Sequence, residues 1–413
     1  MKTRATTTVH GHVIILTLIV CILLGLVLVS VISLGTNEGQ LTARSQSWNG
    51  AIPIAEAGIE EAFTHLKYCP TNRASNGWTL AATGDYYTKS RIMGSTKYDV
   101  TISTNYDPVI TAHGGVRAPN TTNYIVRTVR VMATNEPMFS AAIEATDGIF
   151  FKGSGVTINS YDSGDPRFYL PDGRYDSSKF NANGRVICHY GPFELENGKV
   201  YGRVETTEES SLTLGPNGVV GDLVWHLNNK GIQQGWHTST TSSEFSSVED
   251  PGGVGSLPTR IGGIYTLTNG TYRTASLRGS VVVKGDVRLI VQNDLEVNSL
   301  VVERNAKIKL YVNAADVALK GIDNKNLRAE SFMYFGLAGN RNISLQGNAA
   351  FCGILFAPDA ALSIGGGGSD EIDFLGAIIA RVVTVNGKMT FHFDEATTRL
   401  GSRGFVANRW DEL

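Results

Sequence analysis

The sequence has few cysteines and few prolines, and the cysteine shortage already limits the kinds of site it can hold. Its 413 residues include 4 cysteines and 12 prolines. No two cysteines have the close spacing of a zinc or redox motif, which excludes sites of that kind. Cys21 lies inside an apolar run, so Cys69, Cys188 and Cys352 are left to form at most one intramolecular disulfide. The spacing does not decide whether any two of them pair.

The chain also lacks an excess of charge of one sign. It carries 36 basic and 38 acidic residues, a formal net charge of −2, so we expect no nucleic-acid partner. A G-x-S-x-G motif is absent, and the glycine run at residues 365–368 is not followed by the Lys-Ser/Thr of a phosphate-binding loop. The abundant residue is glycine, with 46 copies at an ordinary hydrophobic content of 42%. That composition is typical of many short strands joined by tight turns.

A charge-free apolar run occupies residues 13–35. A helix needs about 20 apolar residues to cross a membrane, whereas the apolar part of a signal peptide usually has about 7–15. No A-x-A cleavage pattern follows the run, so we predict a retained transmembrane helix. Lys2 and Arg4 precede it and predict that residues 1–12 form a cytoplasmic tail. The rest of the chain would then lie on the far side of the inner (cytoplasmic) membrane, in the periplasm or at the cell surface.

The segment after the apolar run is predicted to continue as an amphipathic helix. Apolar residues recur there at helical spacing, and the helix should end before Cys69 and Pro70. Gly50 and Pro53 predict a kink or a short break. Period-two alternation between residues 98 and 131 then predicts antiparallel strands, so residues 36–136 would form a helix packed on a small antiparallel sheet.

The remaining chain, residues 137–400, is predicted to form a parallel β-helix. Short β-branched triplets recur there at irregular spacing, separated by glycine and asparagine corners. A β-sandwich is the alternative, but it would show more regular hairpin spacing. Residues 401–413 are assigned to a C-terminal tail. The expected fold is therefore mainly β, with one long N-terminal α-helix.

This layout resembles the type IV pilin-like proteins, most of all the PilX-type minor pilins and the pseudopilins. The resemblance depends on the basic tail ending in Gly11, the apolar run, and the AEAGIEEA string at residues 55–62. It implies cleavage by a prepilin peptidase after Gly11, with His12 as the new N-terminus. The sequence departs from the family at His12, where an apolar residue is usual, and at Leu16, where a glutamate is usual. Those departures fit a minor, capping or non-polymerising member, and an ordinary signal anchor with a helical stalk stays open.

Further strings resemble uncharacterised pilin-like proteins of Verrucomicrobia- and Planctomycetes-type bacteria. They lie at residues 153–163, 219–222, 353–360, 375–380 and 391–396. Because the biochemistry of those proteins is largely unknown, the strings bear on the architecture more than on the activity.

Two groups of acidic residues are considered as candidate sites. Asp162, Asp165 and Asp172 lie in a glycine-rich stretch and have the oxygens that calcium prefers, but their spacing does not fit an EF-hand loop. Asx turns are the commoner use of such aspartates. The acidic string at residues 369–373 is interpreted as a flexible corner.

Parallel β-helices often carry polysaccharide-cleaving sites built from carboxylates. Asp359, Asp394 and Glu395 near His392 are the nearest candidates, but no recognisable catalytic signature surrounds them. The histidines are too scattered in the sequence to indicate a metal site, a statement that applies to His189, His226 and His237. We therefore expect no catalytic residue, no cofactor and no metal, and a protein that is not an enzyme.

The combined expectation is a membrane-anchored, pilin-like cell-envelope protein, a minor component of a type IV pilus or a type II secretion-like system. Its partners would be other pilins or pseudopilins, bound through the N-terminal helix, and the membrane itself. An adhesive or glycan-binding β-helix on a signal anchor is the first alternative. A tethered polysaccharide-active enzyme is the second. The sequence does not separate a pilus from a secretion system.

Overall fold

The computed structural model describes residues 10–69, 72–152, 155–208, 210–240, 245–346, 350–365 and 374–413, with side chains from residue 13 onward. The chain divides into two compact units. Unit 1 comprises Met1–Glu136 and Ser402–Leu413, and unit 2 comprises Pro137–Gly401. Unit 2 is therefore inserted before the last strand of unit 1.

Unit 1 consists of one long helix and an antiparallel sheet. Its elements are α1 (His10–Tyr68), β1 (Thr79–Leu80), β2 (Tyr86–Met93), β3 (Thr96–Ser103), β4 (Val109–Arg117), β5 (Tyr124–Pro137) and β27 (Ser402–Glu412). The strands are ordered β1-β2-β3-β4-β5-β27, and β1 to β5 pair with their neighbours in antiparallel register. The antiparallel sheet predicted between residues 98 and 131 is confirmed.

The C-terminal part of α1 packs against this sheet. Ala55, Ile59, Ala62 and Leu66 are at most 1% exposed, and their spacing of three or four residues places them on one helix face. That face contacts β3 and β4. The helix ends at Tyr68, as predicted, but it is unbroken through Pro53, so the predicted break does not occur. Pro53 lacks the N–H that would donate to the carbonyl four residues earlier, so one helical hydrogen bond is lost. The packing of the following turns on the sheet stabilises the helix despite that loss.

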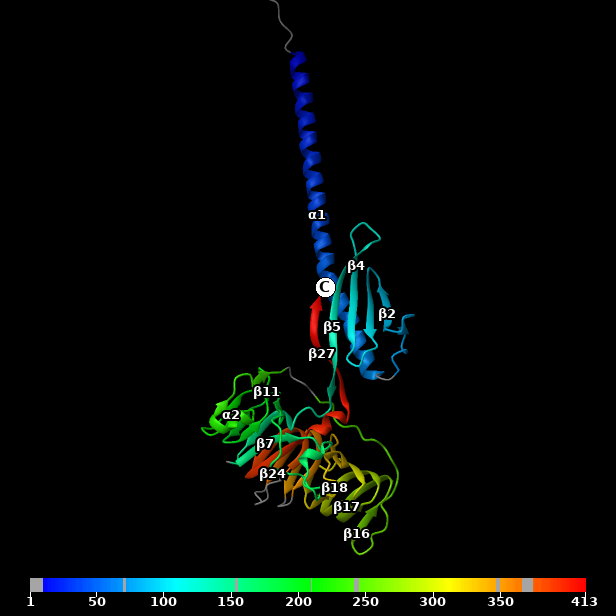
Figure 1. Ribbon diagram of the computed structural model, residues 1–413. Coiled ribbons are helices and arrows are strands. Elements are labelled where there is room, and N and C mark those ends of the chain that lie inside the picture. The colour runs from blue at the N-terminus through cyan, green and yellow to red at the C-terminus, as the bar shows by residue number, and fades with distance from the viewer. Residues whose placement is uncertain are drawn as a thin grey trace, which may run out of the picture. The chain divides into compact units, whose positions relative to one another are not determined.

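The segment that the sequence analysis set aside as a C-terminal tail, residues 401–413, contains the edge strand β27. Asp411 pairs with Arg130 at 3.4 Å, and the Leu413 N–H donates to the Thr128 carbonyl at 3.0 Å. Ser402 contacts Asn135 at the other end of β5. The two strands therefore run in opposite directions, with β27 beside β5 in the sheet (Figure 1). Without β27, the edge of β5 would expose unpaired backbone N–H and C=O groups, which can pair with any strand that reaches them. Because β27 lies far along the sequence, the sequence pattern did not predict this pairing.

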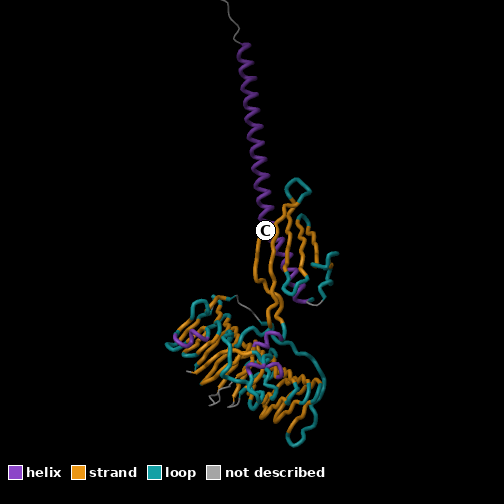
Figure 2. Tube along the Cα trace, viewed as in Figure 1, coloured by secondary structure: helices purple, strands orange, loops and turns teal. Residues whose placement is uncertain are grey.

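Unit 2 is built from short strands joined by loops, and its described helical segments are short (Figure 2). Its first elements are β6 (Ile143–Phe151), β7 (Gly155–Tyr161), η1 (Pro166–Phe168), β8 (Val186–Cys188), β9 (Phe193–Glu196), β10 (Lys199–Tyr201), β11 (Val204–Thr206), β12 (Leu212–Leu214), β13 (Val219–Gly221), α2 (Leu223–Asn228), β14 (Gly231–Ile232) and β15 (His237–Ser239). The later elements are β16 (Ile264–Leu267), β17 (Gly270–Val283), β18 (Asp286–Val302), β19 (Lys307–Val312), β20 (Asp316–Leu319), β21 (Ile322–Asn324), η2 (Ala329–Ser331), β22 (Phe332–Gly336), β23 (Asn342–Gln346), β24 (Phe351–Gly365), β25 (Phe374–Asn386), β26 (Lys388–Asp394) and η3 (Glu395–Arg399).

The register between the described strands of unit 2 is parallel from coil to coil, which confirms the predicted β-helix. The coils do not stack in the order of the sequence. The first coil, β6–β7, pairs on one side with β25–β26 and on the other with β8–β10. The chain thus begins its winding in the middle of the solenoid. It reaches one end at β14 and β15, restarts at the opposite end with β16, and winds back to the middle (Figure 1).

A continuous apolar core runs through the stacked coils. One inward-facing ladder, in which each residue is paired in register with the next, consists of Leu289, Leu310, Tyr334, Leu355, Ile378, Ile143, Val186 and Val204. Each of these side chains is at most 1% exposed. A coil buries this face only against its neighbours, so the core is shared along the whole stack.

A strap along the side of the solenoid, residues 245–260, connects its two ends. The Phe245 ring lies 6.3 Å from that of Phe356, and Val248 forms an isolated bridge with Leu337. Further along, the Arg273 N–H donates to the Gly255 carbonyl at 2.6 Å. The strap thus contacts successive coils in the order in which they stack, and it crosses the outer face of the solenoid from one end to the other.

Candidate functional site

The N-terminal part of α1 is the most unusual surface of unit 1. The large apolar side chains between Val13 and Leu34 are 46% to 69% exposed. Val13–Tyr68 is the one described helix long and apolar enough to cross a membrane, with a mean hydropathy of 3.2 in its most apolar window. A helix that is apolar all round is stable only in lipid or among other apolar helices. This surface is therefore a candidate for membrane insertion, for helix–helix assembly, or for both in turn.

The processing site implied by the resemblance lies at the start of this helix. Gly11 and His12 fall within α1, and their side chains lie outside the described residues. Leu16, at the position where the resembled family usually has a glutamate, is 63% exposed. Cleavage after Gly11 stays a prediction.

The AEAGIEEA string at residues 55–62 has a structural explanation in the packing of α1 on the sheet. Ala55, Ile59 and Ala62 face the sheet, and a side chain at Gly58 would lie 3.2 Å from atoms of Tyr98 and Ala112. On the sheet side of this contact, Gly114 leaves equally little room for a side chain. A Cβ atom at Gly114 would lie 2.2 Å from the backbone nitrogen of Ala55. Small residues on both sides therefore allow the helix and sheet backbones to approach closely.

The carboxylate of Glu61 anchors the same helix face to the sheet. It lies 2.8 Å from both Lys89 Nζ and Arg91 Nη2, and it accepts a hydrogen bond from the Tyr98 hydroxyl. Burial acts to raise the pKa of Glu61, but the hydrogen bonds and positive charges outweigh it and hold the pKa below its usual range. Burial and the Glu61 carboxylate raise the pKa of Tyr98 to about 12. Glu61 is thus an ionised structural residue.

Unit 2 carries an open polar groove of about 620 Å³ that spans several coils. Its central row consists of outward-facing residues paired in register across adjacent coils, namely Glu296, Ala318, Ser344, Ser363 and Thr384. At one end Arg278 Nε lies 2.6 Å from Asp294 Oδ2, and Asn342 donates to Asp316 at 2.8 Å. Because coils repeat at about 4.8 Å, the groove offers hydroxyl, amide and carboxylate groups to an extended polar ligand at that spacing.

This groove was not predicted, although the sequence contains a signal for it. Ser344, Ser363 and Thr384 are each the middle residue of a β-branched or aliphatic triplet, and the alternation of a strand places them on the outer face. What the triplets do not reveal is which coils become neighbours.

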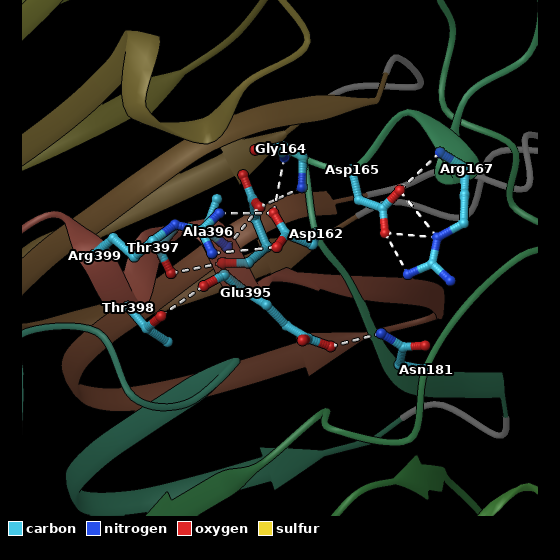
Figure 3. Close-up of polar contacts among 12 residues, drawn as sticks. Asp162, Gly164, Asp165, Arg167, Asn181, Glu395, Ala396, Thr397, Thr398 and Arg399 are labelled. Carbon is cyan, nitrogen blue, oxygen red and sulfur yellow. Dashed lines mark hydrogen bonds and ion pairs between the residues drawn. The ribbon is translucent and has the colours of Figure 1, made fainter.

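The three aspartates considered as calcium ligands are paired with arginines. Arg167 Nη2 lies 2.5 Å from Asp165 (Figure 3). Arg399 Nη2 lies 2.8 Å from Asp162, and Arg174 Nε lies 2.8 Å from Asp172. Asp162 and Asp165 also accept backbone N–H groups two residues on, at 2.8 and 2.9 Å, as in Asx turns. Among the residues that the structure describes, no group of three metal-ligating side chains occurs.

The carboxylates weighed as catalytic residues take part in structural contacts. Glu395 accepts a hydrogen bond from Asn181 at 3.0 Å (Figure 3) and another from Ser160 at 2.8 Å. Asp394 is 1% exposed and accepts the N–H groups of Ser163 and Ala396. Burial raises the pKa of Asp394 above its usual range. These contacts join the turn at η3 to the loop after β7.

The remaining candidates also lie apart. His392 Nδ1 lies 2.6 Å from Asn159 Oδ1, within β26 and β7. The three scattered histidines bind separate partners: His189 contacts Glu144, His226 contacts the Val200 carbonyl, and His237 contacts Thr206. All four cysteines are free, and burial raises the pKa of the Cys188 thiol.

Comparisons with known proteins find a domain model that matches part of the chain and a solved structure that aligns with it. Residues 228–400 match the model of a domain of unknown function, DUF7305, a stretch that includes the strap and the coils from β16 to η3. No curated protein sequence matches the chain. A crystal structure of the competence-associated pilin ComZ from Thermus thermophilus aligns with 89% of this chain and 97% of its own, at 12% identity and a TM-score of 0.22. The narrower resemblance to PilX-type proteins stays a prediction.

Proposed function

We propose that this chain is a non-enzymatic, membrane-anchored, pilin-like cell-envelope protein, a minor component of a type IV pilus or type II secretion-like system. The observation that supports it most is the division of α1 into an apolar, exposed N-terminal part and a C-terminal part packed on a sheet. Before assembly, an exposed apolar helix needs a surrounding of lipid. During assembly, contacts with the helices of other subunits can replace the contacts with lipid. The partners would accordingly be other pilins or pseudopilins.

The proposed location follows from the charges that precede the helix. Lys2 and Arg4 would keep the N-terminus in the cytoplasm, and both units would lie beyond the inner membrane. Position 16 is a leucine, where the resembled family usually has a glutamate. An unpaired glutamate carboxylate would be costly to bury among helices, and this chain does not carry one there. A minor or capping position, where fewer neighbours surround the helix start, suits that composition.

The test is the N-terminal sequence and intact mass of the protein recovered from its native membrane. The processed-pilin form of the proposal expects a chain that starts at His12, and a Gly11→Val variant that is no longer cut. A matched variant at the neighbouring position, His10→Val, should be cut as before. A wild-type chain that starts at Met1 contradicts processing and leaves an anchored β-helix. Co-purification with other pilins after mild detergent extraction tests assembly separately.

A second candidate function, binding of a surface ligand such as a glycan, rests on the polar groove of unit 2. Its central row presents hydroxyl groups on three successive coils, at Ser344, Ser363 and Thr384, and the groove is open to solvent. Binding of neutral oligosaccharides to the full chain in detergent tests it. We expect a Ser344→Val/Ser363→Val variant to bind more weakly, and a variant of a remote exposed residue, Glu208→Gln, to bind as the wild type does.

A further inference from the structure

A second pocket of unit 2, distinct from the polar groove, is strongly basic although the whole chain has a net charge of −2. It encloses about 550 Å³ at the turns that follow β18 and β21. Its basic lining residues are Arg174, Arg304, Lys307, Lys325 and Arg328, and its acidic ones are Asp172 and Glu330. We call it the basic turn pocket.

Three of the five basic side chains are already neutralised. Arg174 pairs with Asp172 at 2.8 Å, Lys307 with Glu330 at 3.3 Å, and Lys325 with Glu303 at 2.9 Å. Arg304 and Arg328 form no side-chain hydrogen bond or ion pair with any residue that the structure describes, and both are exposed. Two guanidinium groups without an acidic partner therefore remain at the pocket.

The turns that carry these two arginines are held in place. The Asn326 side chain accepts the Asn305 N–H at 2.7 Å and donates to the carbonyls of Glu303 and Ala306, both at 3.0 Å. Asn324 donates to the Arg328 carbonyl at 2.8 Å. The pairing of β18 with β21 makes these turns neighbours in the stack, about 4.8 Å apart. Each arginine thus projects from a turn with a fixed backbone.

The backbone of the second turn is also strained. Leu327 has a φ of 54°, a left-handed conformation that a leucine rarely adopts. Such a conformation is kept where surrounding contacts enforce it, and it occurs often at binding sites. It directly precedes Arg328.

We propose that the basic turn pocket binds a phosphate or sulfate group carried on a larger molecule. The guanidinium fork matches the geometry of such an oxyanion and donates charge-assisted hydrogen bonds to it. The volume of about 550 Å³ lies within the range of small-molecule sites and leaves room for the group that carries the oxyanion. The partner is thus an anionic polymer segment or small phosphorylated molecule, recognised by its charge.

The test uses the full chain in a non-ionic detergent, with dextran sulfate as the polymer probe, unmodified dextran as its neutral counterpart, and inorganic phosphate as the free ion. The variant Arg304→Ala/Arg328→Ala should bind dextran sulfate about tenfold more weakly or worse, because it loses two charge-assisted contacts. The matched control is Arg288→Ala/Arg341→Ala, which removes two exposed arginines from the same unit, neither of which lines the pocket. The control should retain wild-type affinity within about twofold, because it leaves the pocket intact; it removes the same net charge as the pocket variant, so any loss it shows measures the non-specific attraction.

Equal losses in the two double variants, or equal binding of dextran and dextran sulfate, would overturn the proposal. Competition by inorganic phosphate that disappears in the Arg304→Ala/Arg328→Ala variant would assign the site to a single oxyanion. A polymer that binds through these arginines without competition from phosphate would assign it to a polymer-borne group. Thermal unfolding of each variant checks that the fold is retained.

Discussion

Glu144 and His189 form a buried pair, with the carboxylate Oε1 2.9 Å from the imidazole Nε2. The two residues are 1% and 2% exposed. Glu144 occupies an outward position of β6, and the residue paired with it in β25 is the buried Ile379. The Phe245 ring of the strap lies 6.0 Å from the His189 ring. The strap therefore covers a polar contact between two adjacent coils.

This contact should be measurable as stability. We expect His189→Ala to lower the free energy of unfolding by about 1.5–3 kcal/mol, because a buried carboxylate loses a hydrogen bond. The control is His113→Ala, which removes an exposed hydrogen bond to Thr128 and should cost less than about 1 kcal/mol. Urea unfolding followed by tryptophan fluorescence checks both. Equal costs would show that burial of the pair contributes nothing.

The close approach of helix and sheet predicts a large effect from one added methyl group. Gly114→Ala would place a Cβ 2.3 Å from the Ala51 carbonyl oxygen, so the helix must shift. We expect a loss of about 1–3 kcal/mol in the stability of unit 1. Gly115→Ala is the matched control, since its Cβ meets only side-chain atoms, at 3.3 Å. The fluorescence of Trp78, which is 2% exposed in the core of unit 1, reports the transition.

The ionised Glu61 predicts a pH dependence. Its pKa lies below the usual 4.5, so its contribution to stability is fully present above pH 4.5 and is lost as the pH falls through the lowered value. Glu61→Gln should therefore destabilise unit 1 by about 1.5–3 kcal/mol at pH 7 and by progressively less below pH 4.5. Urea unfolding of both proteins between pH 3 and 7 checks this. A difference that does not shrink in acid would contradict the assignment.

Asp394 predicts the opposite sign. Burial raises its pKa above the usual 3.8, so the folded state favours the protonated carboxyl and stability is lost as the pH rises through the raised value. Asp394→Asn keeps an oxygen for the N–H groups of Ser163 and Ala396, and its stability relative to wild type should increase from pH 4 to pH 7. Asp394→Ala leaves those groups without an acceptor, so it should be less stable than Asp394→Asn by about 1–3 kcal/mol at every pH. Thermal unfolding across this pH range distinguishes the two variants.

Much of the local structure could be predicted from the sequence. The charge-free run at residues 13–35 and the spacing of Ala55, Ile59 and Ala62 predict one long helix with a buried C-terminal face, and the structure has both. Triplets such as residues 343–345 and 383–385 predict short strands, and these lie in β23 and β25. Such patterns are local, since a helix repeats every 3.6 residues and a strand every 2.

The candidate sites were harder to predict, because charge pairing depends on distant residues. The sequence left calcium binding by Asp162 open beside the commoner Asx turn, and the ion pair with Arg399, far along the chain, could not be predicted from it. Arg304 and Arg328 carry no sequence motif, and only the adjacent stacking of β18 and β21 brings their turns together.

The sequence by itself determined the elements: a long apolar helix, an antiparallel sheet, and a series of short strands with outward-facing polar residues. The tertiary structure alone decided their order. It placed β6 between β25 and β8, and it made residues 402–412 the edge strand beside β5. The physical reason is that any parallel coil with an apolar inner face can stack on any other. The choice of neighbour then depends on register and side-chain fit summed over the whole solenoid, and a local pattern does not contain that sum.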